Sequence, residues 1–385
     1  MVVLLRCKAR KGAILRAAVG LDSAQVGLVP MGSVVEVVAS EMLGAKERVS
    51  VVGAVDGTTG WGSRAMFESC PAAAAAPAAT PRSALLNTGH SIPLLGFGTW
   101  KLPGSAETRA LVRAAIRAGY RHFDTARMYS NEKQIGEAIA EAVAAGEVRR
   151  EDLFVTTKLW NTDHGSKVEA ACRASLAKLG LDYVDLYLVH CPFTTVGPTL
   201  EPPLRETWKE MEKVAALGLA RSVGVSNFSL KKIDALGGDV VPAVNQVELH
   251  PLLRQDALLA GCTARGIHCT AYSPLGSSDS ASFMAHDGPS LLGHAVVRRV
   301  ASDANCTPAQ ALLKFGVQRG CSVLPKSATP SRIQENADVF DAPLPPSAMD
   351  ALAAVEPQRR FLHMKSCVNP KGPYRTLAEF WDEGE

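Results

Sequence analysis

Residues 183–190 read YVDLYLVH, and this stretch decides the fold of most of the chain. It is apolar almost throughout and does not alternate strictly between apolar and polar residues. In an antiparallel sheet with one face exposed to water, the residues of a strand alternate between apolar and polar. Parallel strands that are buried on both faces are instead near-continuous apolar runs. The stretch therefore predicts a buried strand of a parallel sheet, with His190 at the strand's carboxyl end.

Similar apolar stretches recur along the chain, and segments with helical spacing lie between them. In 166–179 the apolar residues recur at helical spacing after a capping box from Ser166 to Glu169, and a second capping box begins at Thr307. Strands that alternate with helices over about 300 residues predict a (β/α)8 TIM barrel in residues 84–385. The predicted strands are 94–98, 120–123, 153–158, 183–190, 220–225, 243–248, 268–272 and 322–325.

A doubly wound sheet is the alternative fold. A nucleotide-binding sheet of that kind carries G-x-G-x-x-G directly after its first strand. Gly96 and Gly98 supply only two of these glycines, and no helix follows at once. We therefore interpret them as a tight turn at a strand end.

The chain before the barrel has a different composition. Residues 71–83 read PAAAAAPAATPRS, which predicts a linker extended by its prolines. Residues 1–70 contain short β-branched runs between turn signals, the pattern of a small all-β barrel. The stretches GAILRAAVGLDSAQVGLVPMGSVVEVV and TTGWGS resemble a bacterial-type SH3-like domain. Such a domain is either an adaptor for a peptide or glycan or a passive accessory domain.

Composition and charge exclude several classes of protein. Hydrophobic residues make up 47% and charged residues 21%, and the net charge is +3 with basic residues spread along the chain. A nucleic-acid-binding face would need clustered basic residues, and a membrane span would need about 20 consecutive apolar residues. The nine cysteines include no C-x-x-C pair, which predicts reduced buried thiols, no metal and a cytoplasmic location.

Polar side chains stand where the predicted strands stop. In a (β/α)8 barrel the carboxyl ends of the strands meet at one mouth, where the chemistry takes place. Each of these residues also has an ordinary structural explanation, such as a helix cap or a buried histidine with a partner. Their convergence on one mouth favours a functional site. They are Asp124 and Tyr129, Lys158, His190, Ser226 and Asn227, Gln246, and Tyr272 and Ser273.

Eight motifs between residues 85 and 385 carry a more specific signal. They are LGFGTW, DTARMYSNE, TTKLW, LDYVDLYLVHCP, GVSNF, NQVELHP, AYSPLG and LPKSATPSRIQEN. In this order they resemble the aldo-keto reductases. The resemblance implies NADPH-dependent reduction of an aldehyde or ketone to the alcohol, with Asp124, Tyr129, Lys158 and His190 as the catalytic residues.

The chemistry of these residue types suits that reaction. Carbonyl reduction needs a hydride at carbon, which the cofactor supplies, and a proton at oxygen, which Tyr129 would supply. We expect the Lys158 ammonium to lower the pKa of the phenol and the Asp124 carboxylate to keep Lys158 charged. His190 would donate a hydrogen bond to the substrate oxygen and orient it.

The same resemblance implies the cofactor site. Tyr272 would stack on the nicotinamide ring, and Ser226, Asn227 and Gln246 would hold its carboxamide. The full predicted set for NADPH or NADP+ is Gly98, Thr99, Trp100, Ser226, Asn227, Gln246, Tyr272, Ser273, Leu275, Lys326, Ser327, Arg332, Glu335 and Asn336.

The stretch from Lys326 to Arg332 favours NADPH over NADH. Thr329 is a predicted helix N-cap and Pro330 a first helical residue, so a phosphate would meet a helix start. Lys326 and Arg332 bracket that start with two positive charges. An arginine can bind a phosphate bidentately, whereas a bare ribose hydroxyl would gain little from it.

The substrate pocket is predicted from Trp100, Trp160 and Cys191. Members of the resembled family often carry a Trp directly after the catalytic His, where this chain has Cys191. The smaller side chain of Cys191 either widens the pocket or packs against its neighbours. The third interpretation is that Cys191 is a reactive thiol. The loop 276–290 and the tail 358–385 would complete the pocket and set specificity.

Other functions remain as alternatives. One is a regulatory or sensor subunit that binds NADPH with little turnover, and the extra domain gives a reason to keep it. A sugar isomerase would need a cluster of metal ligands or a pair of carboxylates that act as bases, and neither pattern occurs in the sequence. We expect a small-molecule carbonyl substrate, no nucleic acid, no membrane, a monomeric barrel and an unknown partner for residues 1–70.

Overall fold

The computed structural model describes residues 81–194, 199–277 and 290–382, together with the backbone of seven strands before residue 70. The chain divides into two compact units, Met1–Ala78 and Ala79–Glu385. Most of the predicted linker 71–83 lies outside the described residues, and Ser83 already belongs to a strand.

The first unit contains one antiparallel sheet. Its strand order is β3-β2-β6-β5-β4-β1-β7. The described strands agree with the all-β prediction, while the SH3-like assignment stays a prediction. The strands are β1 Val3–Cys7, β2 Ala13–Arg16, β3 Gln25–Val29, β4 Val34–Leu43, β5 Lys46–Val52, β6 Thr59–Ser63 and β7 Phe67–Ser69.

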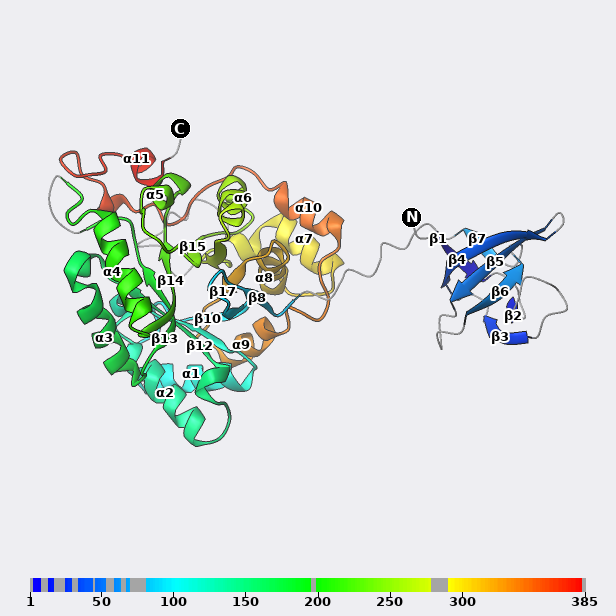
Figure 1. Cartoon of the computed structure of the whole chain (residues 1–385), viewed down its shortest axis with the longest axis horizontal. Helices are drawn as coiled ribbons and strands as arrows, with labels where there is room; N and C mark the ends of the chain where they lie inside the picture. The colour runs from blue at the N-terminus through cyan, green and yellow to red at the C-terminus, as the bar shows by residue number, and fades with distance from the viewer. Residues whose placement is uncertain are drawn as a thin grey trace. The chain divides into compact units, whose positions relative to one another are not determined.

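The second unit is a parallel eight-stranded barrel ringed by helices (Figure 1). Each strand pairs with the next in chain order, and the Val323 amide closes the ring by donating to the Leu94 carbonyl at 2.8 Å. The (β/α)8 prediction is confirmed. The strands are β10 Gly96–Gly98, β11 His122–Asp124, β12 Phe154–Leu159, β13 Val184–Val189, β14 Ala220–Ser226, β15 Val244–Glu248, β16 His268–Tyr272 and β17 Ser322–Leu324.

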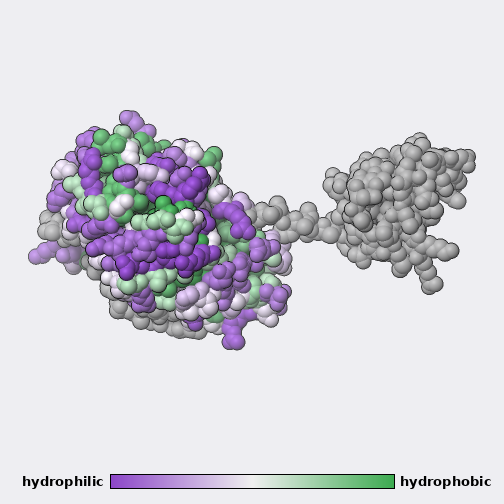
Figure 2. Space-filling model, turned by 90° about the horizontal axis from the view of Figure 1, so that it is seen from below, coloured by the Kyte–Doolittle hydropathy of each residue, from purple (hydrophilic) through white to green (hydrophobic). Residues whose placement is uncertain are grey.

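The barrel strands are buried on both faces, as their apolar sequences predict. Every residue of β13 is buried, including Asp185, whose carboxylate accepts from Arg150 at 2.8 Å. Helices cover the outside, and Figure 2 shows mainly hydrophilic side chains on the face that it presents, with smaller hydrophobic areas between them. The helices are α1 Ala106–Arg117, α2 Glu132–Ala144, α3 Val168–Leu179, α4 Leu204–Ala216, α5 Leu230–Asp234, α6 Asp256–Ala264, α7 Ala295–Asp303, α8 Pro308–Gln318, α9 Pro330–Ala337, α10 Pro346–Ala353 and α11 Leu377–Trp381.

A hairpin that the sequence did not predict covers the amino-terminal end of the barrel. It pairs β8 Ser83–Leu85 with β9 Ser91–Pro93. Leu86 and Ile92 are buried against side chains of the barrel interior such as Phe154 and Leu188. The hairpin leaves the opposite end, where the strands have their carboxyl ends, for the site.

One of the two predicted capping boxes is confirmed. Thr307 Oγ1 accepts from the Gln310 amide at 3.2 Å, and Gln310 Oε1 accepts from the Thr307 amide at 3.0 Å. The box from Ser166 to Glu169 is wrong, because Ser166 lies in a 3-10 turn and α3 begins two residues later. Glu169 instead accepts from Arg173 one turn along the helix at 2.8 Å.

Within the described ranges no helix could span a membrane, and no cluster of His, Cys, Asp and Glu could hold a metal ion. The cysteines of the second unit that the structure describes are all free.

Candidate active site

A cavity of about 1190 Å³ opens at the carboxyl ends of the barrel strands. The predicted site residues converge on it, although they come from eight strand ends and the helix after β17. Lys158 lies behind the wall with no exposed surface. The predicted residues that line the cavity are Gly98, Thr99, Trp100, Asp124, Tyr129, Trp160, His190, Cys191, Ser226, Asn227, Gln246, Tyr272, Ser273, Leu275, Lys326, Ser327, Arg332, Glu335 and Asn336.

Lys158 links Asp124 and Tyr129. Its ammonium donates to Asp124 Oδ1 at 2.5 Å, to the Thr125 carbonyl at 3.0 Å and to the Tyr129 hydroxyl at 3.3 Å. An ammonium has three donors, so these acceptors use all of them. The other Asp124 oxygen accepts from Gln246 Nε2 at 2.7 Å. Because the Tyr129 oxygen accepts from Lys158, the phenol proton is free to be donated to something else.

Burial is the main influence on the ionisation of Tyr129 and Lys158. It raises the pKa of Tyr129 well above 10, and the Asp124 carboxylate acts in the same direction. Burial also lowers the pKa of Lys158, although Asp124 opposes that shift. From the sequence we expected Lys158 to lower the pKa of Tyr129, but the pKa is raised, because the loss of hydration on burial is the largest effect. Tyr129 is therefore a neutral phenol at neutral pH.

His190 lies edge-on between Tyr129 and Trp160. The ring centroids are 5.8 Å and 5.3 Å away, respectively. Burial, reinforced by the Lys158 charge, holds the pKa of His190 well below 6.5. The imidazole is therefore neutral at neutral pH, with one nitrogen able to donate a hydrogen bond and one able to accept.

Asn227 organises the strand ends beside His190. Its backbone has φ of +65°, a left-handed conformation that Asn tolerates better than most residues. Its side-chain amide donates to the His190 carbonyl at 3.0 Å and lies 3.6 Å from Cys191 Sγ, while Oδ1 accepts from the Tyr272 hydroxyl at 2.7 Å. Neighbouring Ser226 Oγ donates to the Gln246 carbonyl at 2.9 Å. These contacts join β13, β14, β15 and β16 at the mouth.

Cys191 packs against this group. It is 3% exposed, and burial raises the pKa of its thiol well above 9. A reactive cysteine is a thiolate, which a low pKa would favour. The packing interpretation therefore fits Cys191, and the reactive-thiol interpretation does not.

The far part of the cavity lies against the start of α9. Thr329 is the N-cap and Pro330 the first helical residue, as predicted, but no side chain caps the helix. Lys326, Ser327 and Arg332 line the cavity there, and Asn336 Oδ1 is buried without a hydrogen-bond partner among the described residues. A helix start with uncapped amides and nearby cations is suited to an anion.

Other lining residues were not predicted as site residues. Met128 directly precedes Tyr129, and Phe193 lies two residues after Cys191, so proximity in sequence could have indicated them. Thr307, Pro308 and Ala309 come from the start of α8, and Leu362, His363, Met364, Lys365 and Cys367 come from the tail. The tail was predicted as a segment without individual residues. Most of the predicted loop 276–290 lies outside the described residues.

A barrel with buried acid–base groups at its carboxyl-terminal mouth defines a (β/α)8 enzyme that acts on a small molecule. The aldo/keto reductase family model matches residues 94–357. The chain is 46% identical over 301 residues to rat aldo-keto reductase family 1 member A1, covering 74% of this chain and 92% of that protein. It is 42% identical over 314 residues to an aldo/keto reductase of Synechocystis, covering 77% and 95%.

The chain therefore belongs to the aldo-keto reductase family. It is an NADP-dependent oxidoreductase of the aldehyde reductase type. The human member A1 protein is also 46% identical, over 296 residues that cover 72% of this chain and 90% of that protein.

Proposed function

We propose that the barrel reduces an aldehyde or ketone to the alcohol with NADPH and that Tyr129 supplies the proton. The observation that carries this proposal is the donation from Lys158 to the Tyr129 hydroxyl at 3.3 Å, with Asp124 behind Lys158. It leaves a neutral phenol that lines the cavity and keeps its proton for a carbonyl oxygen.

When bound, NADPH supplies the hydride that the carbonyl carbon accepts. Tyr129 gives its proton to the carbonyl oxygen and becomes a phenolate, whose charge Lys158 stabilises through the existing hydrogen bond. Asp124 keeps Lys158 protonated against the effect of burial. Neutral His190 donates a hydrogen bond to the same carbonyl oxygen and orients it. Preorganised donors of this kind need no rearrangement as the charge develops.

The residues of the cavity fit NADPH. Tyr272 would carry the nicotinamide ring, with Ser226, Asn227 and Gln246 at its carboxamide. The uncapped start of α9, with Lys326 and Arg332, would receive a ribose phosphate. Gly98, Thr99, Ser273 and Leu275 would lie against the rest of the cofactor, and the buried unpartnered Asn336 Oδ1 would meet the adenine side. Trp100, Trp160 and Cys191 would then surround the substrate.

Replacing Arg332 with Ala should raise the KM for NADPH by about 10- to 100-fold, because a hydrogen bond to a charged group contributes about 1.5–3 kcal/mol. The KM for NADH should change little, since NADH has no phosphate for Arg332 to bind. Steady-state kinetics with both cofactors measures this. Arg299→Ala, an exposed arginine on α7 outside the cavity, is the control. Equal catalytic efficiencies of the wild-type protein with NADPH and NADH would contradict the phosphate site.

A screen of NADPH oxidation against aldehydes, sugars and ketones tests the activity itself. Turnover of one of these classes is the expected result. If no carbonyl is reduced while NADPH still binds, the regulatory subunit becomes the better account. The cytoplasmic location, the monomeric barrel and a partner for residues 1–70 stay predictions from the sequence.

A further inference from the structure

The C-terminal tail is fastened to the barrel at its start by a buried carboxylate. Glu248 has no exposed surface and accepts from the amides of Phe361 and Leu362 at 2.7 and 2.8 Å. His250 Nε2 lies 2.9 Å from the same carboxylate. Burial works to raise the pKa of Glu248, but the bonds from His250 and the two tail amides outweigh it and hold the pKa below its ordinary value. This end of the tail is firmly held.

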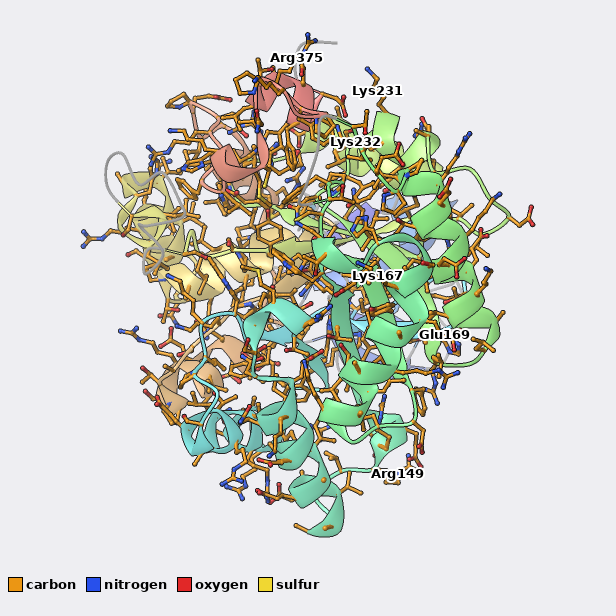
Figure 3. The ribbon with its side chains drawn as sticks, turned by 90° about the vertical axis from the view of Figure 1, so that its left-hand side faces the viewer. Arg149, Lys167, Glu169, Lys231, Lys232 and Arg375 are labelled. Atoms are coloured by element: carbon orange, nitrogen blue, oxygen red, sulfur yellow. The ribbon has the colours of Figure 1, made fainter. Side chains whose placement is uncertain are left out.

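The far end of the tail is fastened to α5. Asp382, which follows α11, contacts Lys232 Nζ and Ser229 Oγ at hydrogen-bond distance, and Lys231 Nζ lies 3.9 Å away. The side chains of Lys232 and Asp382 are 8% and 14% exposed. Lys232 Nζ also lies 4.9 Å from the ring centroid of Tyr374. Figure 1 shows α11 beside α5, and Figure 3 shows Lys231 and Lys232 at the same end of the barrel as Arg375.

Between these two points the tail contacts the loop that follows His190. The Tyr374 hydroxyl donates to the Pro192 carbonyl at 2.8 Å. Phe380 is fully buried, with Tyr374 at 5.2 Å and Phe193 at 6.0 Å between ring centroids. Phe193 lines the cavity. The Asp382 end of the tail therefore connects to a wall of the substrate pocket three residues beyond His190.

We propose that Asp382 and Lys232 form a latch that holds the tail against Pro192 and Phe193 and so fixes the outer wall of the substrate pocket. They are positioning residues for substrates long enough to reach Phe193 and the tail. Short substrates that meet only Tyr129 and His190 do not depend on the latch. This inference rests on the proposed carbonyl reduction.

The latch, and not the Glu248 anchor, is the point at which the tail can be released. The Glu248 anchor is fully buried and joins backbone amides, so that opening it would leave an unpaired charge inside the protein. The latch joins two side chains that keep some exposure, and it lies at the end of α11. Loss of the ion pair therefore loosens the wall without exposing the barrel core.

Asp382→Asn is the cleanest variant for a test. Asp382 has φ of +53° and ψ of +39°, a left-handed conformation that Asn also tolerates, whereas most other residues would add strain. Asn has the same shape and removes only the charge. Glu379→Gln is the matched control, since it removes a carboxylate three residues earlier, on α11, in a more exposed pair with Arg375, 2.9 Å apart.

The test compares propanal with biphenyl-4-carbaldehyde, using full-length protein. Asp382→Asn and Lys232→Met should each raise the KM for the biphenyl aldehyde by about tenfold, and the double variant should do no more than either single one, because both changes remove the same contact. The kcat and KM for propanal, the KM for NADPH and the values for Glu379→Gln should stay those of the wild type.

Equal changes for both aldehydes, additive effects in the double variant, or the same change in Glu379→Gln would overturn the latch. Wild-type kinetics in Asp382→Asn would also overturn it while leaving the proposed function intact. A wild-type protein that reduces neither aldehyde nor any other carbonyl would overturn the proposed function, and the latch with it. Wild-type NADPH affinity and a cooperative thermal unfolding transition would show that the variants are folded.

Discussion

Replacing Tyr129 with Phe is expected to lower kcat for aldehyde reduction by about 1,000-fold, since a positioned general acid contributes about 10²–10⁴-fold. Only the hydroxyl is removed. The ring keeps its contacts with His190 at 5.8 Å and with the Lys158 ammonium at 4.9 Å. The cavity should therefore keep its shape, and the Kd for NADPH, measured by fluorescence titration, should not change.

The control is Tyr187→Phe, which removes a hydroxyl from a fully buried tyrosine of β13 outside the cavity. It should keep wild-type turnover. If Tyr129→Phe also kept near-normal turnover, Tyr129 would not be the proton donor.

Replacing Lys158 with Met should lower kcat by about 10²–10³-fold, the usual effect of removing one preorganised donor. It should also destabilise the fold. Without Lys158, the Asp124 carboxylate is buried without its cation and keeps only Gln246 as a side-chain donor among the contacts described. Removal of one partner from a buried ion pair costs about 3–5 kcal/mol of the free energy of unfolding, which urea denaturation would measure.

A matched pair of variants separates these two effects. The double variant Asp124→Asn, Lys158→Met has no unpaired charge, so it should regain most of the stability while staying inactive. Lys314→Met removes another buried lysine, whose Nζ donates to the Ala342 carbonyl at 2.5 Å outside the cavity. It should leave kcat unchanged. Recovery of turnover in the double variant would show that Lys158 acts only through stability.

The barrel could be predicted from the sequence because each strand is a short apolar run with its own flanking signals. The predicted strand 268–272 has the same bounds as β16, and the other strands differ by at most two residues at either end. The β8–β9 hairpin could not be predicted in this way. Its strands have three residues each, which is too few for a periodic pattern.

The candidate site residues could be named because each stands in a local motif at a strand end or in α9. The direction in which the pKa of Tyr129 shifts could not be predicted. It depends on burial of Tyr129 by the assembled barrel and not on the neighbours of Tyr129 in the sequence. The contacts of the tail left no local signal either. Glu248 meets Phe361 across 113 positions of the chain, and Lys232 meets Asp382 across 150.

The pH dependence of kcat/KM for aldehyde reduction tests the role of Tyr129 most directly. Burial holds the pKa of His190 well below 6.5 and that of Tyr129 well above 10, so neither group changes its charge between these values. Tyr129 as the proton donor therefore predicts a level profile from about pH 7 to pH 9 and a loss only in more alkaline solution, where the phenol loses its proton. A fall in kcat/KM as the pH rises through about 6 to 7 would assign the proton to a histidine and would contradict the account.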